Sequence, residues 1–410
     1  MKNEQKLFYG SCFALITTAF SFAFRASILP SLGAELNIGE TELGYVNMMW
    51  FWGFPISMII GGLIYHSVGG KKIMQFALFA HSAGIIFTVL APMFGGAGYA
   101  VLLIATLLIG LGNGCTEAAC NPMIADTYSG NMMSKMMNRF HMWFPGGIVI
   151  GSLITTFLPG LSWQAITLIL LVPTAIYAYM FAGTEWPKAK TAEAASYSGN
   201  LKAMASPLFI FMLAAMAFTA MSEFAPQQWV AVTLAESGAQ PMVVLALATG
   251  LMAVARYFGG EAVHRFNTTG VLLGSAILAT IGLFLFSTQT GAMVYVAAVV
   301  YGLGIAYFWP NMIGFIADFI PKSGALGMSI VGAMGMFMSG LVQPVTGGWI
   351  ESNREKGIAE GMTGGELELF TGQETLGTTI IFPIVLIGMF TVLYIWMKRR
   401  AEAKPEAVAA

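Results

Sequence analysis

The chain has 410 residues, of which 57% are hydrophobic and 10% are charged, and its formal net charge is -1. Soluble domains carry roughly 25% charged residues, so this composition is typical of an integral membrane protein rather than a soluble one. The balanced charge, with no basic stretch interleaved with aromatic residues, argues against a nucleic-acid-binding protein.

Apolar segments of about 20 residues are long enough to cross a bilayer as helices. Twelve such segments follow one another, so the sequence predicts an all-α integral membrane protein with twelve transmembrane helices. In chain order the predicted spans are residues 7–29, 42–66, 73–92, 99–126, 137–158, 163–183, 206–234, 241–264, 270–288, 291–318, 324–349 and 375–397. The first is too long for the apolar core of a signal peptide, so we expect an uncleaved span.

Two longer connections divide the predicted spans. Residues 184–205 are the longest polar interruption near the midpoint, and they separate an N-terminal six-helix bundle, 1–183, from a C-terminal six-helix bundle, 206–397. We expect 184–205 to be a cytoplasmic linker and 398–410 to be a cytoplasmic tail. An acidic, Gly-rich stretch, 351–374, is expected to form a single large loop before the last helix.

Lysine and arginine concentrate in the cytoplasmic loops of membrane proteins. If the termini, the linker and the loops after even-numbered spans lie on one side, that side holds 15 of the 19 basic residues. The other side holds Arg354 and Lys356, while Arg25 and Arg256 lie within spans. The sequence therefore predicts a multi-pass protein of the cytoplasmic (inner) membrane with both termini cytoplasmic.

An internal repeat relates the two halves of the chain. Residues 110–126 read GLGNGCTEAACNPMIAD and residues 302–318 read GLGIAYFWPNMIGFIAD, so Gly-Leu-Gly and Ile-Ala-Asp recur at a constant offset of 192 residues. The fourth and tenth spans are therefore predicted to be copies of one helix. Parallel repeats of this kind place substrate sites at their interface, near the middle of the membrane.

A degenerate signature lies at the end of the second predicted span and just after it. Its residues are Gly62, His66, Ser67, Gly69, Gly70 and Lys71. They resemble the motif Gly-x-x-x-Asp-Arg-x-Gly-Arg-Arg/Lys of the major facilitator superfamily. The resemblance implies the major facilitator fold, with two pseudo-symmetric six-helix bundles, and transport by alternating access. His66 and Ser67 replace the Asp and Arg of the motif, which departs from the charge network that locks the outward-facing state in the family.

Within that superfamily the fourth span is similar to the fucose-galactose-glucose:proton symporters, whose Glu-x-Ala-x-Asn-Pro pattern corresponds to Glu117, Ala119, Asn121 and Pro122. Glu223 and Trp229 also have the spacing of that family's Glu and Trp in the seventh span. The first span departs from the family: Arg25 and Ala26 stand where the symporters carry Asn and a proton-coupling Asp. Proton coupling therefore does not follow from the resemblance alone.

Four ionisable residues lie well inside the predicted spans: Arg25, Glu117, Glu223 and Arg256. Each costs about 2.5–3.5 kcal/mol at the centre of a lone helix, so we expect them to be paired, hydrated or functional. The expected pairs are Arg25 with Glu117 and Arg256 with Glu223, or the same four with partners exchanged. A Glu without a partner would favour proton coupling, whereas a paired Glu would favour substrate binding, uniport or a purely structural role.

Amides and aromatic rings accompany these charges. Asn113 and Asn121 share a helix face with Glu117, and Trp309 aligns with Glu117 in the repeat. Amides donate and accept hydrogen bonds, as a polyhydroxylated neutral ligand requires, although each amide could instead join two helices. The predicted substrate-binding residues are Asn113, Glu117, Asn121, His141, Gln227, Gln228, Trp309 and Asn311.

Polar residues at the cytoplasmic ends of the spans are interpreted as gating residues. They are His66, Lys71, Asp126, His264, Arg265 and Asp318. His66 and His264 end the matched second and eighth spans, and we expect them to contact Asp126 or Asp318. His81 is interpreted as a core histidine.

The combined pattern predicts a secondary transporter of a small neutral hydrophilic solute, a monosaccharide, with protons as a possible coupling ion. A drug exporter or an organic-anion transporter of the same fold is the alternative. Neither an enzyme nor an ATP-driven pump is expected, because the spans carry no nucleophile-base-metal constellation and no phosphate-binding glycine loop. We expect no metal, cofactor or nucleic acid, and a monomer whose partners are a small-molecule substrate and the lipid bilayer.

Overall fold

The structure, a computed structural model, describes residues 1–187, 202–257 and 259–406, and those residues form helices and short connections. The first half contains α1 (Asn3–Leu36), α2 (Glu40–Val68), α3 (Gly70–Leu90), the 3-10 turn η1 (Ala91–Ala97), α4 (Gly98–Thr127), α5 (Gly130–His141), α6 (Trp143–Phe157), α7 (Trp163–Ile169) and α8 (Leu171–Phe181). Most of the predicted linker, 188–201, lies outside the described residues.

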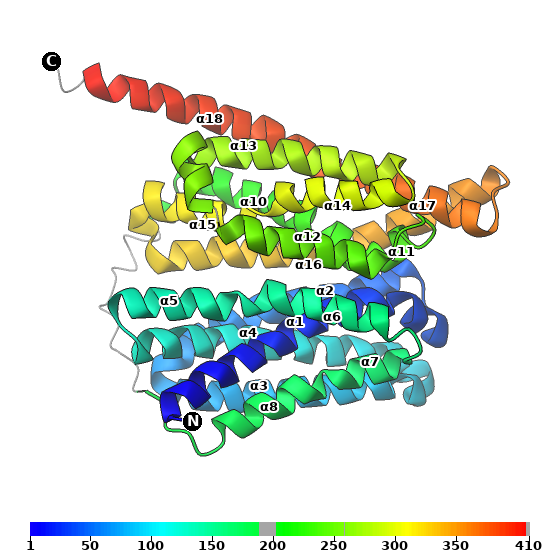
Figure 1. Ribbon diagram of the computed structural model, residues 1–410, viewed down its shortest axis with the longest axis horizontal. Helices are drawn as coiled ribbons and strands as arrows, with labels where there is room; N and C mark the ends of the chain where they lie inside the picture. The colour runs from blue at the N-terminus through cyan, green and yellow to red at the C-terminus, as the bar shows by residue number, and fades with distance from the viewer. Residues whose placement is uncertain (188–201, 258, 407–410) are drawn as a thin grey trace.

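The second half begins after the linker. It contains α10 (Pro207–Gln228), α11 (Val230–Thr233), α12 (Pro241–Tyr257), α13 (Gly259–Thr288), α14 (Ala292–Ile305), α15 (Phe308–Phe319), the 3-10 turn η2 (Pro321–Ser323), α16 (Gly324–Ala359), α17 (Gly364–Thr379) and α18 (Ile381–Glu406). Ser206 caps the first of these helices, because its hydroxyl accepts the backbone N–H of Phe209 at 3.3 Å. Figure 1 shows α1–α8 on one side of the molecule and α10–α18 on the other.

Ten helical segments in the described part of the chain are long and apolar enough to cross a membrane. One of them, 70–127, contains both α3 and α4, which are joined by the turn η1, and α12 is a shorter apolar helix. Each of the twelve predicted spans therefore has a helical counterpart. Two spans are interrupted, one near its start at Met142, between α5 and α6, and one near its middle at Ala306 and Tyr307, between α14 and α15.

The stretch 351–374 is not a loop, as the sequence predicts, but a helical hairpin. The helix α16 continues to Ala359, and α17 begins at Gly364 after a turn in which Gly361 has a φ of 85°. The Glu, Lys and Arg residues of this stretch are good helix formers. Arg354 also joins the two arms, because its Nε lies 3.0 Å from Oε1 of Glu368.

The repeated Gly-Leu-Gly motif packs in the same way in both halves. A Cβ at Gly110 would overlap the backbone of Trp50 on α2, and a Cβ at Gly302 would lie 2.7 Å from the carbonyl oxygen of Ala248 on α12. Glycine thus lets α4 pack closely on α2 and lets α14 pack closely on α12. The duplicated sequence therefore encodes the same close packing of helices twice.

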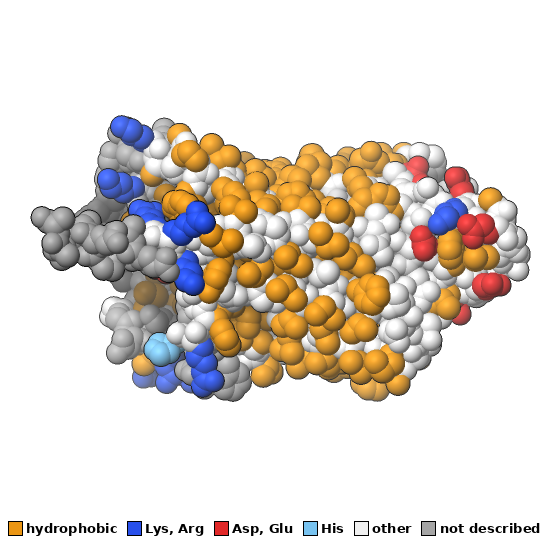
Figure 2. Space-filling model, turned by 90° about the horizontal axis from the view of Figure 1, so that it is seen from above, with side chains coloured by type: hydrophobic (Ala, Val, Ile, Leu, Met, Phe, Trp, Pro, Cys, Tyr) orange, Lys and Arg blue, Asp and Glu red, His pale blue; other side chains and the backbone are white. Residues whose placement is uncertain are grey.

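Basic and acidic side chains gather at opposite ends of the molecule. Figure 2 shows a broad hydrophobic belt, with Lys and Arg gathered at one end and Asp and Glu at the other. Both termini lie at the basic end in Figure 1, and we call it the terminal end and the opposite one the far end. A belt flanked by polar ends is the surface expected of a multi-pass membrane protein.

Candidate functional site

A central cavity lies between the two halves. Its volume is 490 Å³, within the range of small-molecule sites, and it is lined by α1, α2, α4, α5, α6, α10, α12, α15 and α16. Most of the lining is apolar, with six aromatic rings: Phe22, Trp50, Phe54, Phe144, Phe224 and Trp309. Four side chains that can carry charge also face it: Glu117, His141, Glu223 and Arg256.

Glu117 is the acidic group that α4 presents to the cavity. Its Oε2 accepts a hydrogen bond of 2.6 Å from Nδ2 of Asn121, one helical turn along the same face. The side-chain oxygen of Asn121 is buried and has no hydrogen-bond partner among the described residues. Glu117 thus presents a carboxylate at the N-terminal wall of the cavity, while Asn121, which is not among the lining residues, bonds that carboxylate from the next turn of α4.

The second acid, Glu223, lies on α10 near an arginine. Its Oε1 is 3.9 Å from Nη2 of Arg256 on α12, and its Oε2 is buried with no hydrogen-bond partner in the residues that the structure describes. Arg256 is itself held by a hydrogen bond of 2.9 Å from its Nε to the carbonyl oxygen of Ala306. That carbonyl is available because Pro310, four residues further along, has no backbone N–H to donate to it. The wall from the C-terminal half therefore carries a loosely spaced ion pair.

Arg25 on α1 does not meet Glu117. Its Nε and Nη2 donate to the side-chain oxygen of Gln228 at 3.0 and 2.5 Å, and its Nη1 is buried with no hydrogen-bond partner within 1–187, 202–257 and 259–406. The guanidinium lies 4.4 Å from the ring centroid of Trp50, so a cation–π contact replaces an ion pair. The Nε2 of Gln228 donates in turn to the carbonyl oxygen of Phe22 at 3.3 Å. A cation and a neutral amide thus join the two halves.

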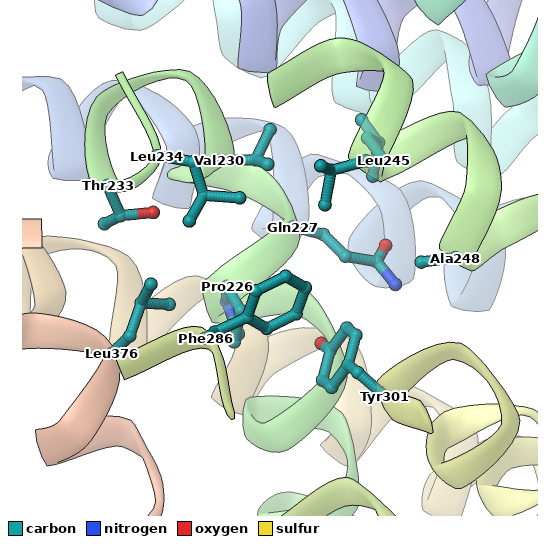
Figure 3. A pocket seen from close by; sticks show the side chains of 11 residues that line it. Pro226, Gln227, Val230, Thr233, Leu234, Leu245, Ala248, Phe286, Tyr301 and Leu376 are labelled. Carbon is teal, nitrogen blue, oxygen red and sulfur yellow. The ribbon is translucent and has the colours of Figure 1, made fainter. Parts of the chain in front are cut away.

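Two predicted substrate ligands lie away from the central cavity. Gln227 points into a separate void of about 20 Å³ inside the C-terminal half, near Tyr301 and Ala248 (Figure 3). Asn113 is fully buried between His81 and Ser21, with which it forms hydrogen bonds.

The remaining predicted ligands differ in position. His141 and Trp309 line the central cavity. Neither Asn121 nor Asn311 is among its lining residues, and Nδ2 of Asn311 is buried without a hydrogen-bond partner in the described part of the chain. Among the described residues, no group of three His, Cys, Asp or Glu side chains is placed to hold a metal ion.

The predicted gating residues lie at the terminal end. Asp126 accepts a hydrogen bond from the hydroxyl of Tyr65 at 3.0 Å, and Lys71 donates to the carbonyl oxygen of Thr184 at 3.2 Å. The side chains of His66, His264, Arg265 and Asp318 are exposed. The two hydrogen bonds lie within the N-terminal half and do not cross between the halves.

The halves are instead joined at the far end, by residues that the sequence did not single out. Glu351 on α16 accepts hydrogen bonds from the backbone N–H and the hydroxyl of Thr41, at 2.9 and 2.6 Å. Arg354 pairs with Glu40 at the start of α2, at 2.5 Å. We call these four residues the far-end contact. The acidic stretch 351–374 is the feature of the sequence that could have indicated the far-end contact.

Comparison with known proteins agrees with this architecture. A family model described as Major Facilitator Superfamily matches residues 11–344. The chain belongs to the Major Facilitator Superfamily. A mutant of the nucleoside transporter NupG has a similar fold, with a TM-score of 0.75 and 14% identity over 96% of this chain and 100% of that chain. FucP in its outward conformation is similar too, with a TM-score of 0.57 and 17% identity over 92% and 98%.

Curated relatives of this superfamily member match shorter stretches. Sodium-dependent phosphate transport protein 1 of Arabidopsis thaliana is 26% identical over 161 residues, which is 39% of this chain and 29% of that protein. The hexuronate transporter of Bacillus subtilis (strain 168) is 22% identical over 184 residues, 43% and 41% of the two chains. The chain thus matches less than half of either relative. The predictions of the major facilitator fold and of a transporter are confirmed, at the level of the family.

Proposed function

We propose that this chain is a secondary transporter of a small polyhydroxylated organic anion, of the sugar-acid kind, that works by alternating access. The observation that carries this proposal is Arg25: a guanidinium at the interface of the halves, 6% exposed, whose hydrogen-bond acceptor is a neutral amide. Because an uncompensated charge is costly in a membrane protein, such a residue is expected to serve a ligand. A substrate carboxylate would supply the missing counter-charge through two parallel hydrogen bonds.

The remaining polar groups suit hydroxyl recognition. Carboxylates accept hydrogen bonds from sugar hydroxyls, and Glu117 and Glu223 offer such acceptors at the cavity. The ring of Trp309 in the opposite wall can lie against the C–H face of a pyranose. This set of acceptors and rings supports a carbohydrate-like body on the substrate.

The names of the curated relatives point in the same direction. They describe a phosphate transport protein and a hexuronate transporter, and others describe anion and ascorbate transporters. These matches cover only part of each protein, so the names support an anionic substrate class without specifying the molecule. The neutral monosaccharide predicted from the amides differs from this class by lacking a carboxylate.

The proposed cycle alternates between two openings, with 1–183 and 206–397 as the moving bundles. The far-end contact and the bond between Arg25 and Gln228 both join the halves beyond the cavity, which supports an inward-facing form closed to the outside. The basic terminal end would be cytoplasmic by the positive-inside rule. Opening at the far end would break the bond to Gln228 and expose Arg25 to an arriving anion.

A neutral monosaccharide is the second candidate, favoured by the carboxylate of Glu117, which faces the cavity with an amide rather than a cation as its partner. That charge would repel an anion unless it carried a proton. Anion transport therefore predicts proton symport, whereas transport of a neutral sugar would allow uniport.

The proposal can be tested by thermal shift and uptake in proteoliposomes with D-glucuronate, D-gluconate, D-glucose, L-fucose and a lipophilic cationic drug. We expect stabilisation and uptake with at least one sugar acid, and Arg25→Lys to weaken its binding by about tenfold because lysine lacks the planar fork. Stabilisation by a neutral sugar alone would replace this substrate class with the second candidate. Stabilisation by the drug alone would favour export.

A further inference from the structure

A chain of hydrogen bonds crosses five helices of the N-terminal half. Tyr177 on α8 bonds Nδ1 of His81 on α3 at 3.0 Å, and Nε2 of His81 bonds the side-chain oxygen of Asn113 on α4 at 3.0 Å. The Nδ2 of Asn113 donates to the hydroxyl of Ser21 on α1 at 3.3 Å. The chain ends at Trp50 on α2, whose indole N–H donates to the same hydroxyl at 2.9 Å.

The donor and the acceptor of each of these hydrogen bonds can be assigned by starting from Ser21. The hydroxyl of Ser21 donates to the carbonyl oxygen of Thr18 at 2.8 Å, so its oxygen accepts from both Asn113 and Trp50. The oxygen of Asn113 must then accept from His81, which requires the tautomer with hydrogen on Nε2. The Nδ1 of the neutral ring accepts from the hydroxyl of Tyr177.

Trp50, the last residue in this series of hydrogen bonds, borders two cavities. Trp50 lines the central cavity, and together with Arg25 it also lines a small void of about 30 Å³. The guanidinium of Arg25 lies 4.4 Å from its ring centroid. The orientation of this indole therefore determines how closely a ligand in the cavity can approach Arg25.

We propose that His81 is a positioning residue for the substrate site, acting through Asn113 and Ser21 to hold the indole of Trp50 between the cavity and Arg25. This inference rests on the proposed function in one respect, that the substrate contacts Trp50 and Arg25. His81 is fully buried and is not among the residues that line the central cavity. Its effect on a ligand must therefore pass along the hydrogen bonds.

The repeated Gly-Leu-Gly motif makes room for this histidine. A Cβ at Gly112 would overlap the ring of His81. The equivalent glycine of the second half, Gly304, instead faces the backbone of Ala279 on α13. The same motif thus seats a polar ring in the N-terminal half and a plain helix contact in the C-terminal half, which places the positioning chain on the side of Arg25.

The direct test observes Trp50 itself. In protein labelled with ¹⁵N-tryptophan, the indole N–H signal of Trp50, assigned by its loss in Trp50→Phe, should shift and exchange faster in His81→Leu. His81→Gln keeps an N–H that can reach Asn113, so it should restore the signal. Thr116→Val removes another fully buried hydroxyl of α4, which bonds the carbonyl oxygen of Gly112, and it should leave the signal unchanged.

Ligand affinity provides the second measurement, with D-glucuronate as the probe and D-glucose as the alternative probe. His81→Leu should weaken binding by about tenfold, and His81→Gln by less than about threefold. In a Trp50→Phe background, His81→Leu should cause no further loss, because the ring then has no N–H to hold. Should His81→Leu fail to fold, Tyr177→Phe, which removes the terminal donor, should give a smaller shift of the same signal.

An unchanged Trp50 signal in both His81→Leu and Tyr177→Phe would overturn the positioning role, as would a full additional loss of affinity in the Trp50→Phe background. Failure of the proposed function has a different signature. In that case neither probe binds the wild-type protein, while the Trp50 signal still responds to His81→Leu.

Discussion

Arg25 on α1 donates two hydrogen bonds to the side-chain oxygen of Gln228 on α10, so a buried cation joins the two halves through a neutral amide. A carboxylate in place of the Gln228 amide would form an ion pair with Arg25, which would hold the halves together more strongly. The amide is compatible with release, because its bonds to a charged group contribute only about 1.5–3 kcal/mol. The junction can therefore open during a transport cycle.

The first prediction follows from this junction. Gln228→Glu should raise the melting temperature in detergent and reduce uptake by about tenfold or more, because the new ion pair must break in each cycle. Gln227→Glu is the matched control. It places the same carboxylate one residue away in a small void without a cation, so it should lower the melting temperature. A rise in both variants would refute the role of Arg25.

A second prediction concerns Glu117 as a proton carrier. Glu117→Gln should abolish substrate accumulation driven by an imposed pH gradient, while exchange of labelled for unlabelled substrate across the membrane continues. The amide cannot bind and release a proton, yet it retains an oxygen that can accept from Asn121 and from substrate hydroxyls. Accumulation in wild-type protein that ignores the pH gradient would show that transport is not coupled to protons.

The far-end contact leads to a third prediction. Glu40→Gln removes the charge that Arg354 meets across the halves, and it should shift the population toward the outward-open form by roughly fivefold, since partly exposed ion pairs contribute up to about 1 kcal/mol. Distances between spin labels at the far end report this shift. Glu374→Gln serves as the control, because Glu374 pairs with Lys356 within one half and should not move the distances.

Close helix packing gives the fourth prediction. Gly110→Ala should destabilise the fold by about 1–3 kcal/mol, because its Cβ would overlap the backbone of Trp50. Gly302→Ala should behave alike in the other half. Gly274→Ala in α13 meets no atom within 4 Å, so it should be neutral or slightly stabilising. Thermal unfolding in one detergent compares all three. Equal melting temperatures would contradict the packing argument.

The membrane-spanning segments could be predicted well because apolar length is a local property of the chain. The breaks at Met142 and at Ala306 and Tyr307 do not follow from apolar length, but Pro145 and Pro310 signal them, because proline has no backbone N–H for the carbonyl four residues earlier. The prediction of a loop at 351–374 is wrong, because a run of glycines and acidic residues is typical of loops but here forms a helical hairpin. Contacts of Arg354 with Glu40 and Glu368, distant in sequence, accompany its helical form.

The site residues show the same division. Glu117, Glu223, Arg256, His141 and Trp309 line the central cavity, as their polarity or their place in the repeat indicated. Gln227 and Gln228 are neighbours in sequence but enter different surroundings, because successive residues of a helix point about 100° apart. The sequence predicts His81 as a core residue, and it is fully buried, yet its hydrogen bonds reach the cavity wall through two other helices.

By itself, the sequence determined the membrane class, the order of the helices and the duplicated frame in which Gly110 and Gly302 recur, because length, apolarity and repetition are read along the chain. Tertiary structure alone decided which partner each buried charge meets. The rotation of each helix about its axis and the packing of its neighbours set those distances, and they turned Arg25 away from Glu117 and toward Gln228.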